Sequence, residues 1–433
     1  MTRWLYSWLI WLVQPLVRRK LARRGIQEPG YLEAVEERFG HYTSSPGARD
    51  GNTIWVHAVS LGETRAAAVL VARLRQHLPG MRLLLTHGTA TGRAEGARLL
   101  QTGDIQAWQP WDTPVAVRRF LEHFRPRLGI LMETEIWPNL VVACAQRRVP
   151  LVLANARLSE KSLRKAQRLA WLSLPAYRSL AAVWAQTEGD AARLRELGAP
   201  VRGVFGNLKF DAAPNSDQLA QGRAWRAALG RPVIMFASSR EGEEAELLLL
   251  LKSLRAQPGG GVECAAVQWL IVPRHPQRFD EVADLVRAQG FTLSRRSDWQ
   301  SRPAAADVWL GDSLGEMALY YGLSDAALLG GSFAPLGGQN LIEAAACGCP
   351  VLMGPHTFNF EEAASLAEEA GAALRQENLA QAVTAVLTLA ADPAHQATLA
   401  QAANDFAQAH RGAADKTTAA VLVLLAQQGV DAL

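Results

Sequence analysis

The sequence has few cysteines. Four occur in 433 residues, namely Cys144, Cys264, Cys347 and Cys349. They are too few for the disulfide framework of a small secreted protein. Cys347 and Cys349 lack a second pair of ligands nearby, so a zinc site is not expected. The lack of a disulfide framework indicates a protein whose body works in a reducing compartment.

Two glycine-rich nucleotide motifs are also missing. The sequence contains no G-x-G-x-x-G and no G-x-x-x-x-G-K-[ST]. The first marks a dinucleotide-binding turn and the second a loop that holds a nucleoside triphosphate. Neither a dinucleotide nor a P-loop triphosphate is therefore indicated.

Most of the chain lacks an excess of charge of one sign. The 45 basic and 41 acidic residues give a net charge of +4, and six of the basic residues lie in the first 25 positions. The remainder is close to neutral, so the broad basic surface of a nucleic-acid-binding protein is not expected.

The N-terminal apolar stretch is short. It covers residues 4–17, whereas spanning a bilayer core takes about 20 apolar residues. Five basic residues follow within 18–24, which is typical of a segment held at the cytoplasmic side of a membrane. One helical face carries three tryptophans, a residue that favours the membrane interface: Trp4, Trp8 and Trp11. We predict a membrane-associated helix in residues 1–25, with a buried amphipathic helix as the alternative; spanning and interfacial placements both stay open.

Short apolar runs alternate with helical patterns from residue 52 onward. The runs expected to form strands are 53–59, 81–87, 128–133, 150–156 and 181–186, then 232–239, 268–275, 307–312, 326–333 and 349–354. Strands that alternate with helices predict parallel, doubly wound sheets. A polar, turn-forming segment at 210–222 separates two similar α/β halves. We predict a cleft between the halves, with ligands beyond the carboxyl ends of the strands.

Polar residues follow several strands of the second half. Arg274 lies in a proline-bounded loop and is suited to a phosphate, although a surface ion pair is the alternative. Ser313 and Gly315 are expected to open a helix whose first amides bind an anion, and Glu316 either belongs to this site or complements the helix dipole.

The richest stretch of the second half is 330–360. Asn340 is a candidate helix cap, and Glu343 follows at capping-box spacing. The alternative is that the Glu343 carboxylate accepts hydrogen bonds from two adjacent ribose hydroxyls.

Carboxylates follow two strands of the first half. Glu133 and Glu135 are expected to point the same way if the backbone between them is extended, which would suit sugar hydroxyls or a cation. Lys209 precedes the domain boundary and could meet negative charge on a leaving phosphate, or it could be a solvated cation. Glu63 lies in "AVSLGE", where it is either a first-turn acid or a catalytic base; the helix start is expected to keep its carboxylate ionised.

Eight motifs in order together resemble the bacterial 3-deoxy-D-manno-oct-2-ulosonic acid (Kdo) transferase family. They are "AVSLGE", "METEIWPN", "NARLS", "GNLKFD", "PRHPQRF", "GDSLGEM", "GGSFAPLGGQN" and "GPHTFNF". The resemblance runs from the N-terminal helix to about residue 362. Two motifs depart from the family pattern: Gln339-Asn340-Leu341 stands where His-Asn-Pro is common, and His87-Gly88 interrupts a threonine-rich loop. The first departure bears on a nearby sugar or nucleotide contact, and neither involves Glu63.

The resemblance implies an inverting GT-B glycosyltransferase, an α/β protein of two Rossmann-like domains facing a central cleft. It would bind CMP-Kdo and the lipid A precursor (lipid IVA), transfer Kdo at the cytoplasmic face of the inner membrane in lipopolysaccharide synthesis, and release CMP. It implies an acceptor-binding domain at 26–212 and a CMP-Kdo-binding domain at 213–433, after the membrane-associated helix at 1–25.

The resemblance also assigns residue roles. Glu63 matches the catalytic base, and Glu133 and Lys209 match transition-state stabilisers. The CMP contacts are implied at Pro273, Arg274, Leu314, Gly315, Glu316, Asn340, Leu341, Ile342 and Glu343. No cofactor beyond the donor substrate and no metal are expected, because a leaving monophosphate can be neutralised by cations and helix N-termini.

Two rival hypotheses remain at this point. A nucleotide-sugar epimerase of the same architecture would act on a soluble UDP-sugar and would not need residues 1–25. A membrane-tethered binding protein would bind nucleotide without turnover. The sequence does not indicate how many Kdo units are added, the acylation of the acceptor or the oligomeric state.

Overall fold

The computed structural model describes residues 2–44, 52–257, 266–300 and 302–430, so Cys264 lies outside the described residues. The chain forms two compact units. The first comprises Met1–Asp211 together with Arg411–Leu433, and the second comprises Ala212–His410.

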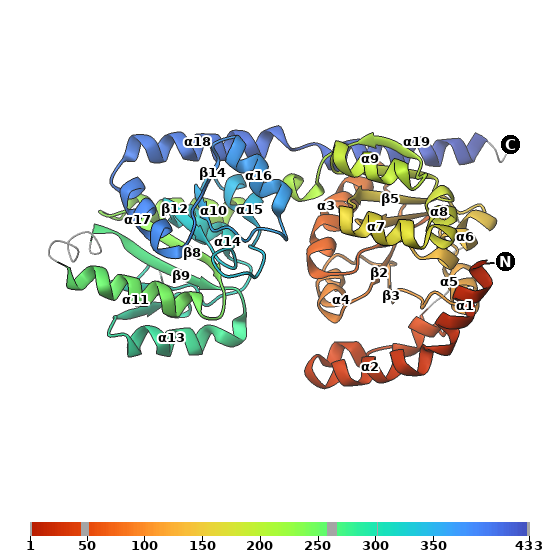
Figure 1. Ribbon diagram of the computed structural model, residues 1–433, viewed down its shortest axis with the longest axis horizontal. Coiled ribbons are helices and arrows are strands. Elements are labelled where there is room, and N and C mark those ends of the chain that lie inside the picture. Colours follow the sequence, from red (N-terminus) through yellow and green to blue (C-terminus); the bar gives the residue numbers. More distant parts are fainter. Residues whose placement is uncertain (1, 45–51, 258–265, 301, 431–433) are drawn as a thin grey trace. The chain divides into compact units, whose positions relative to one another are not determined.

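The first unit, which carries the strand labels β2, β3 and β5 in Figure 1, is built on a parallel sheet. In the described residues this sheet has seven strands in the order β3-β2-β1-β4-β5-β6-β7. Its strands are β1 (Thr53–His57), β2 (Arg82–His87), β3 (Ile105–Trp108), β4 (Leu128–Met132), β5 (Leu151–Ala156), β6 (Ala182–Ala185) and β7 (Val201–Val204). β1 and β4 are fully buried. The strand order reverses between β1 and β4, which is where open α/β sheets place their ligands.

Helices pack on both faces of this sheet. The helices of the unit before residue 200 are α1 (Thr2–Leu12), α2 (Gln14–Gln27), α3 (Leu61–His77), α4 (Ala90–Ala97), α5 (Pro114–Phe124), α6 (Pro138–Gln146), α7 (Glu160–Arg168), α8 (Ala170–Arg178) and α9 (Glu188–Glu196). Three 3₁₀ segments are η1 (Pro29–Leu32), η2 (Val35–Phe39) and η3 (Leu208–Asp211). One hydrophobic cluster packs α5 and α6 against the sheet, and another packs α3 on its other face.

The second unit repeats the plan with the order β10-β11-β9-β8-β12-β13-β14. Its strands are β8 (Val233–Ser239), β9 (Gln268–Pro273), β10 (Leu293–Arg295), β11 (Val308–Leu310), β12 (Ala326–Leu329), β13 (Val351–Met353) and β14 (Ala373–Arg375). Its helices are α10 (Ser216–Ala227), α11 (Glu243–Ala256), α13 (Phe279–Ala288), α14 (Met317–Leu323), α15 (Leu341–Ala346), α16 (Glu361–Glu369), α17 (Leu379–Ala390) and α18 (Pro393–Ala409), with η4 (Pro276–Arg278) and η5 (Arg296–Asp298). Two parallel Rossmann-like sheets agree with the predicted α/β fold class.

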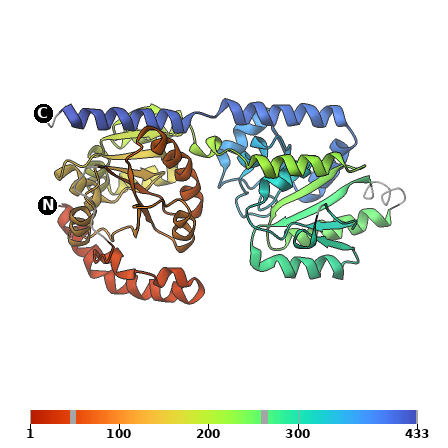
Figure 2. The ribbon, with the colours of Figure 1, turned by 180° about the vertical axis from the view of Figure 1, so that it is seen from behind.

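The last helix, α19 (Ala413–Val430), belongs to the first unit, whereas the sequence placed all of 213–433 in the second domain. The helix lies along the first unit in both views (Figures 1 and 2). Its Val421 and Leu425 join the apolar cluster on the α3 face of the sheet. Asp211 also accepts a hydrogen bond of 2.6 Å from the Ala414 amide. Apolar burial and this contact fix the end of the chain to the first unit.

Helix α1 is attached to the first unit through one face only. The Tyr6 hydroxyl donates to Asp112 at 2.9 Å, and the Trp111 indole donates to the Ile10 carbonyl at 3.1 Å. The opposite face is open, with Trp4 73%, Trp8 49% and Trp11 59% exposed. None of the helices in the described residues is long and apolar enough to cross a membrane.

Candidate active site

Glu63 lies in the first turn of α3, directly after β1 and beside the point where the strand order reverses. Its carboxylate accepts a hydrogen bond from the Val59 amide at 2.9 Å and another from the Ser60 hydroxyl at 3.1 Å. Ser60 is the N-cap, and its side chain accepts from the Glu63 amide. The sequence S-L-G-E thus forms a reciprocal contact of the capping-box kind. The Val59 backbone amide and the Ser60 side chain together fix the position of the Glu63 carboxylate.

The pKa of Glu63 is raised to about 7, mainly by burial and further by the charges of Glu133 and Glu135. The hydrogen bond from the Val59 amide lowers the pKa but does not outweigh burial. Hydrogen bonds at the helix start favour the ionised carboxylate, as expected, but burial raises the pKa by more than they lower it. A carboxyl group that titrates near neutral pH suits proton transfer better than an ordinary one.

Glu133 follows β4, the strand beside β1. It adopts a left-handed backbone (φ 56°), so the extended geometry expected from Glu133 to Glu135 is not formed. Glu135 instead accepts a hydrogen bond from the Trp137 indole at 2.8 Å. Positive φ is costly for a residue with a side chain and often occurs at functional sites. The turn brings the Glu133 carboxylate to Lys209.

Lys209 lies in η3, close in space to the end of β4. Its ammonium group is 3.2 Å from Glu133 Oε1, and both side chains are largely buried, at 20% and 12% exposed. The guanidinium of Arg157 lies 3.9 Å from the other Glu133 oxygen. The first unit therefore brings together Glu63, Glu133 and Lys209, all three residues that the sequence assigned to catalysis.

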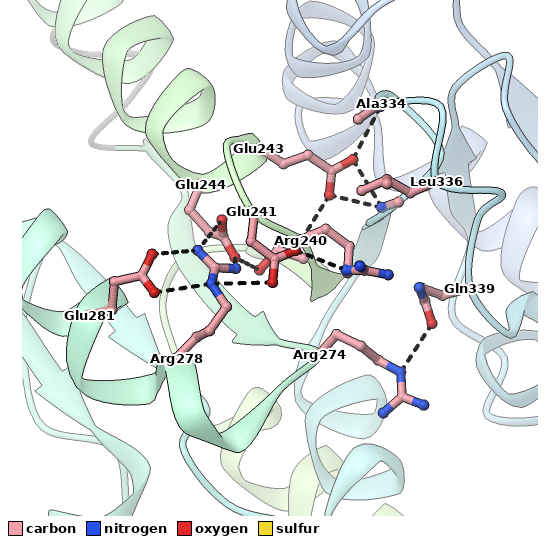
Figure 3. Close-up of polar contacts among 12 residues, drawn as sticks. Arg240, Glu241, Glu243, Glu244, Arg274, Arg278, Glu281, Ala334, Leu336 and Gln339 are labelled. Atoms are coloured by element: carbon pink, nitrogen blue, oxygen red, sulfur yellow. Dashed lines mark hydrogen bonds and ion pairs between the residues drawn. The ribbon is translucent and has the colours of Figure 1, made fainter. Parts of the chain in front are cut away.

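Arg274 follows β9 in the second unit and is exposed. Its Nε donates to Gln339 Oε1 at 3.2 Å, as Figure 3 shows. Pro273 is the last, buried residue of β9. The positive charges of Arg240 and Arg274 both lower the pKa of His275, after the larger effect of burial. Two guanidinium groups thus lie near the carboxyl ends of β8 and β9.

Sequence reasoning missed Arg240 and Glu243, which follow β8. The Glu243 carboxylate accepts from the Gly331 amide at 2.8 Å and from the Arg240 amide at 2.9 Å (Figure 3). It therefore ties the loop after β12 to the loop after β8. The sequence feature that could have indicated these two residues is the charged segment "REGEE", which directly follows a buried parallel strand.

A buried ion pair supports this edge of the sheet. Arg278 donates to both oxygens of Glu244, at 2.7 and 3.1 Å, and also to Glu281 at 3.0 Å (Figure 3). Bidentate geometry of this kind holds side chains in a fixed orientation. The pair stabilises the loop that carries Arg274.

The loop before α14 contains three predicted contacts. Leu314 is 73% exposed, and Gly315 has a positive φ of 80°. Glu316 is the N-cap residue of α14 and pairs with Arg296 at 2.8 Å. The helix begins at Met317, with Glu316 as its N-cap, so Ser313 and Gly315 precede the helix and do not open it as expected.

Asn340 caps α15, as predicted, with its Oδ1 accepting from the Ile342 amide at 3.3 Å. Leu341 and Ile342 are buried, so their side chains do not contact solvent. Gly337 has φ 90°, and a Cβ there would lie 2.3 Å from the side-chain nitrogen Nδ2 of Asn359. Only glycine fits this turn, which positions Asn340 at the loop edge.

Metal ligands do not gather in the described part of the chain. No group of three or more His, Cys, Asp or Glu residues there is arranged to hold a metal ion.

Comparisons with known proteins identify relatives. A family model described as 3-Deoxy-D-manno-octulosonic-acid transferase (kdotransferase) matches residues 33–212. The 3-deoxy-D-manno-octulosonic acid transferase of Bordetella pertussis is 46% identical over 96% of this chain and 98% of its own. That of Haemophilus influenzae is 34% identical over 88% of this chain and 89% of its own.

A solved structure shows the same fold. UDP-GlcNAc 2-epimerase from Neisseria meningitidis, bound to UDP-GlcNAc, has a TM-score of 0.58 and covers 86% of this chain and 99% of its own. Its identity of 16% limits this likeness to the fold, which is of the GT-B kind.

Proposed function

The chain belongs to the 3-deoxy-D-manno-octulosonic acid transferase family and is a Kdo transferase, and from this premise we propose its reaction in full. Kdo is taken from CMP-Kdo and joined to the lipid A precursor, lipid IVA, with inversion at the anomeric carbon. CMP is released. The product belongs to the inner core of lipopolysaccharide.

The observation that carries this proposal is the Glu63 carboxylate, fixed by two hydrogen bonds and with a pKa raised to about 7. In an inverting displacement, the acceptor hydroxyl loses its proton to Glu63 while its oxygen attacks the anomeric carbon. The bond from that carbon to the phosphate oxygen breaks, and the electron pair leaves with CMP. One base suffices, and no covalent nucleophile is needed.

Charge stabilisation is assigned to the Glu133–Lys209 pair. Negative charge grows on the leaving phosphate as the glycosidic bond breaks, and a fixed ammonium group stabilises it more than mobile water does. Glu133 holds Lys209 Nζ at 3.2 Å and thereby orients it.

Donor binding is assigned to the second unit. Arg274 is the proposed phosphate contact, and Pro273 belongs to the same strand end. The remaining proposed CMP contacts are Leu314, Gly315, Glu316, Asn340, Leu341, Ile342 and Glu343. The exposed guanidinium of Arg274 and its link to Gln339 support the phosphate contact. We propose that the reaction needs no metal and no cofactor beyond CMP-Kdo.

The proposed location is the cytoplasmic face of the inner membrane. The exposed tryptophans of α1 and the basic residues of α2 support it, because aromatic rings bind the membrane interface and cations bind anionic lipid.

The decisive assay supplies CMP-Kdo and lipid IVA and follows Kdo-lipid formation, CMP release and anomeric configuration. Folded protein that yields no Kdo-lipid would refute the proposed acceptor. An epimerase would instead convert a UDP-sugar without any lipid.

The pH profile of kcat/KM is expected to rise about tenfold per pH unit up to about pH 7 and then level off, because Glu63 must be deprotonated to act as base. The Glu135→Gln variant is expected to shift the rising part of the profile to lower pH, since the Glu135 charge helps to raise the pKa of Glu63. A rising part at unchanged pH in Glu135→Gln would contradict the effect of the Glu135 charge on the pKa of Glu63.

The Arg274→Ala variant is expected to raise the Kd for CMP by about tenfold to 100-fold, because it removes one charged hydrogen bond to the phosphate. Calorimetric titration with CMP measures the change. Arg287→Ala on α13, which removes another exposed arginine, paired with Asp284, is the matched control. Equal affinities in the two variants would remove Arg274 from the donor site.

Replacing Trp4, Trp8 and Trp11 together with serine is expected to weaken binding to phospholipid vesicles by about 100-fold, at about 1 kcal/mol for each ring. The Trp171→Ser variant on α8 removes another exposed tryptophan and should bind vesicles normally. Sedimentation with vesicles measures both. Unchanged binding by the triple variant would refute the membrane role of α1.

A further inference from the structure

A cavity of about 350 Å³ lies in the first unit beneath α2. Its floor is formed where β1, β2, β3 and β4 end, and its walls include η1 and η2. The lining is mostly apolar, with Tyr31, Trp111 and Trp137 among its aromatic residues. A cavity at the carboxyl ends of parallel strands is in the usual position for a ligand.

Two buried polar side chains line the cavity. Each has at least one nitrogen or oxygen atom with no hydrogen-bond partner among the described residues. His57 is 1% exposed and has no partner for Nε2; Gln109 is 6% exposed and has none for Oε1 or Nε2. Buried polar groups are nearly always hydrogen-bonded. These atoms therefore indicate a polar ligand.

The protonation of His57 indicates which kind of group it meets. Its Nδ1 lies 3.1 Å from the Thr86 carbonyl oxygen and 2.9 Å from the Thr86 hydroxyl. The carbonyl can only accept, which favours the tautomer with the proton on Nδ1. Burial, together with the charge of His87, lowers the pKa of His57 to about 3, so the ring is neutral. Nε2 is then an acceptor and suits a hydroxyl, while the Gln109 amide can both donate and accept.

Cations surround the same cavity. Lys20 and Arg24 from α2 and Arg38 from η2 all line it. In the described residues, no carboxylate lies within ion-pair distance of these three side chains. Arg38 stacks on Trp108 at 3.8 Å and donates one hydrogen bond to the Gly88 carbonyl at 3.1 Å, and Arg24 lies over the Tyr31 ring at 5.5 Å. Three cations without carboxylate partners indicate an anion, and guanidinium groups favour phosphate.

Two residues that line the cavity also act on the proposed base, Glu63. Val59 lines it, and the Val59 amide holds Glu63 Oε2 at 2.9 Å. Glu135 also lines it, and its charge contributes to the raised pKa of Glu63. A sugar in the cavity therefore lies next to the proposed base.

We propose that this cavity binds the phosphorylated sugar head group of the acceptor. Lys20, Arg24 and Arg38 contact the phosphate, and His57 and Gln109 contact sugar hydroxyls. The assignment rests on the proposed lipid acceptor. An anionic phospholipid would satisfy the cations but would leave the buried His57 and Gln109 atoms without hydroxyls, so the sugar is favoured.

The first test uses Gln109→Met, which keeps the side-chain volume and removes the amide. Because the amide has no protein partner, the melting temperature is expected to stay or rise, while the KM for lipid acceptor rises about tenfold for the lost hydrogen bonds. The KM for CMP-Kdo is expected to stay unchanged. A lower melting temperature with unchanged acceptor KM would mean that Gln109 is structural and would overturn its role.

The second test separates the cavity from general attraction to lipid. Lys20→Ala/Arg24→Ala removes two cations that line the cavity, whereas Arg19→Ala/Arg23→Ala removes two exposed cations of the same helix that do not. In non-ionic detergent, only the first pair is expected to raise acceptor KM, by about tenfold or more. Equal effects of both pairs, or a change in donor KM instead, would overturn the proposal.

The third test reads binding without turnover. Calorimetry compares a deacylated glucosamine disaccharide that carries phosphates with its phosphate-free form and with vesicles of anionic phospholipid. The phosphorylated disaccharide is expected to bind wild type and to lose affinity in Gln109→Met and in Lys20→Ala/Arg24→Ala. Equal binding of both disaccharides, or sensitivity of vesicle binding to Gln109→Met, would refute the assignment. Failure of the Kdo-transfer assay with intact disaccharide binding would instead count against the proposed reaction alone.

Discussion

The Glu63→Gln variant is expected to lose kcat by about 10²–10⁴-fold, the usual cost of removing a general base. Glutamine has nearly the same shape and keeps an oxygen that can accept from the Val59 amide. It cannot take a proton from the acceptor hydroxyl. CMP binding, which is assigned to the second unit, is expected to stay near normal. Steady-state kinetics with CMP-Kdo and lipid IVA, together with CMP titration, measure both effects.

The capping contact supplies a control, because Ser60 and Glu63 cap α3 reciprocally. Ser60→Ala removes the cap but keeps the carboxylate, and is expected to cost about 1 kcal/mol of unfolding free energy. Its kcat is expected to fall far less than that of Glu63→Gln. Similar losses of activity in the two variants would mean that Glu63 serves only the helix start. Full activity of Glu63→Gln would exclude it as the base.

Interior strands were predicted from the sequence and edge strands were not. The ten expected strands correspond to β1, β2, β4, β5 and β6 in the first unit and to β8, β9, β11, β12 and β13 in the second. The four missed strands, β3, β7, β10 and β14, are the edges of the two sheets. Central parallel strands are covered on both faces and form continuous apolar runs, whereas these short edge strands include polar residues such as Gln106 and Arg202.

The membership of α19 in the first unit could not be read from the sequence. Its alanine-rich pattern predicts a helix, and the structure confirms a helix there. Apolar residues on a helix do not specify which of two similar sheets will cover them. Specific contacts, such as the hydrogen bond from the Ala414 amide to Asp211, determine which sheet α19 covers, and these contacts depend on the folded backbone.

The positions of the site residues were more predictable than their chemistry. Parallel strands end at one edge, so residues after β1 and β4 had to lie close together. The raised pKa of Glu63 depends on burial that only the packed structure defines. The left-handed turn at Glu133 is equally a tertiary feature, since glutamate does not favour positive φ. The hydrogen bond from the Gly331 amide to the Glu243 carboxylate joins residues 88 positions apart, and no local sequence pattern indicates such a contact.

The Lys209→Met variant is expected to lower kcat by about 10²–10³-fold, as loss of one preorganised charge-stabilising group does. Methionine keeps much of the side-chain length but no charge. The KM for acceptor is expected to change little, because the proposed role concerns charge that develops as CMP leaves. Lys209→Arg keeps the charge and is expected to recover part of the activity. Wild-type kcat in Lys209→Met would exclude this role.

Loss of activity in Lys209→Met has a second possible origin, because the variant also leaves the largely buried Glu133 carboxylate without its ammonium partner. A double-mutant cycle with Glu133→Gln separates the two. If Lys209 only neutralises Glu133, the double variant regains activity, because it no longer contains a buried carboxylate that has lost its ammonium partner. If Lys209 acts on the leaving phosphate, the double variant stays as slow as Lys209→Met, while Glu133→Gln alone loses activity through a poorly oriented ammonium group. The proposed mechanism requires the second outcome.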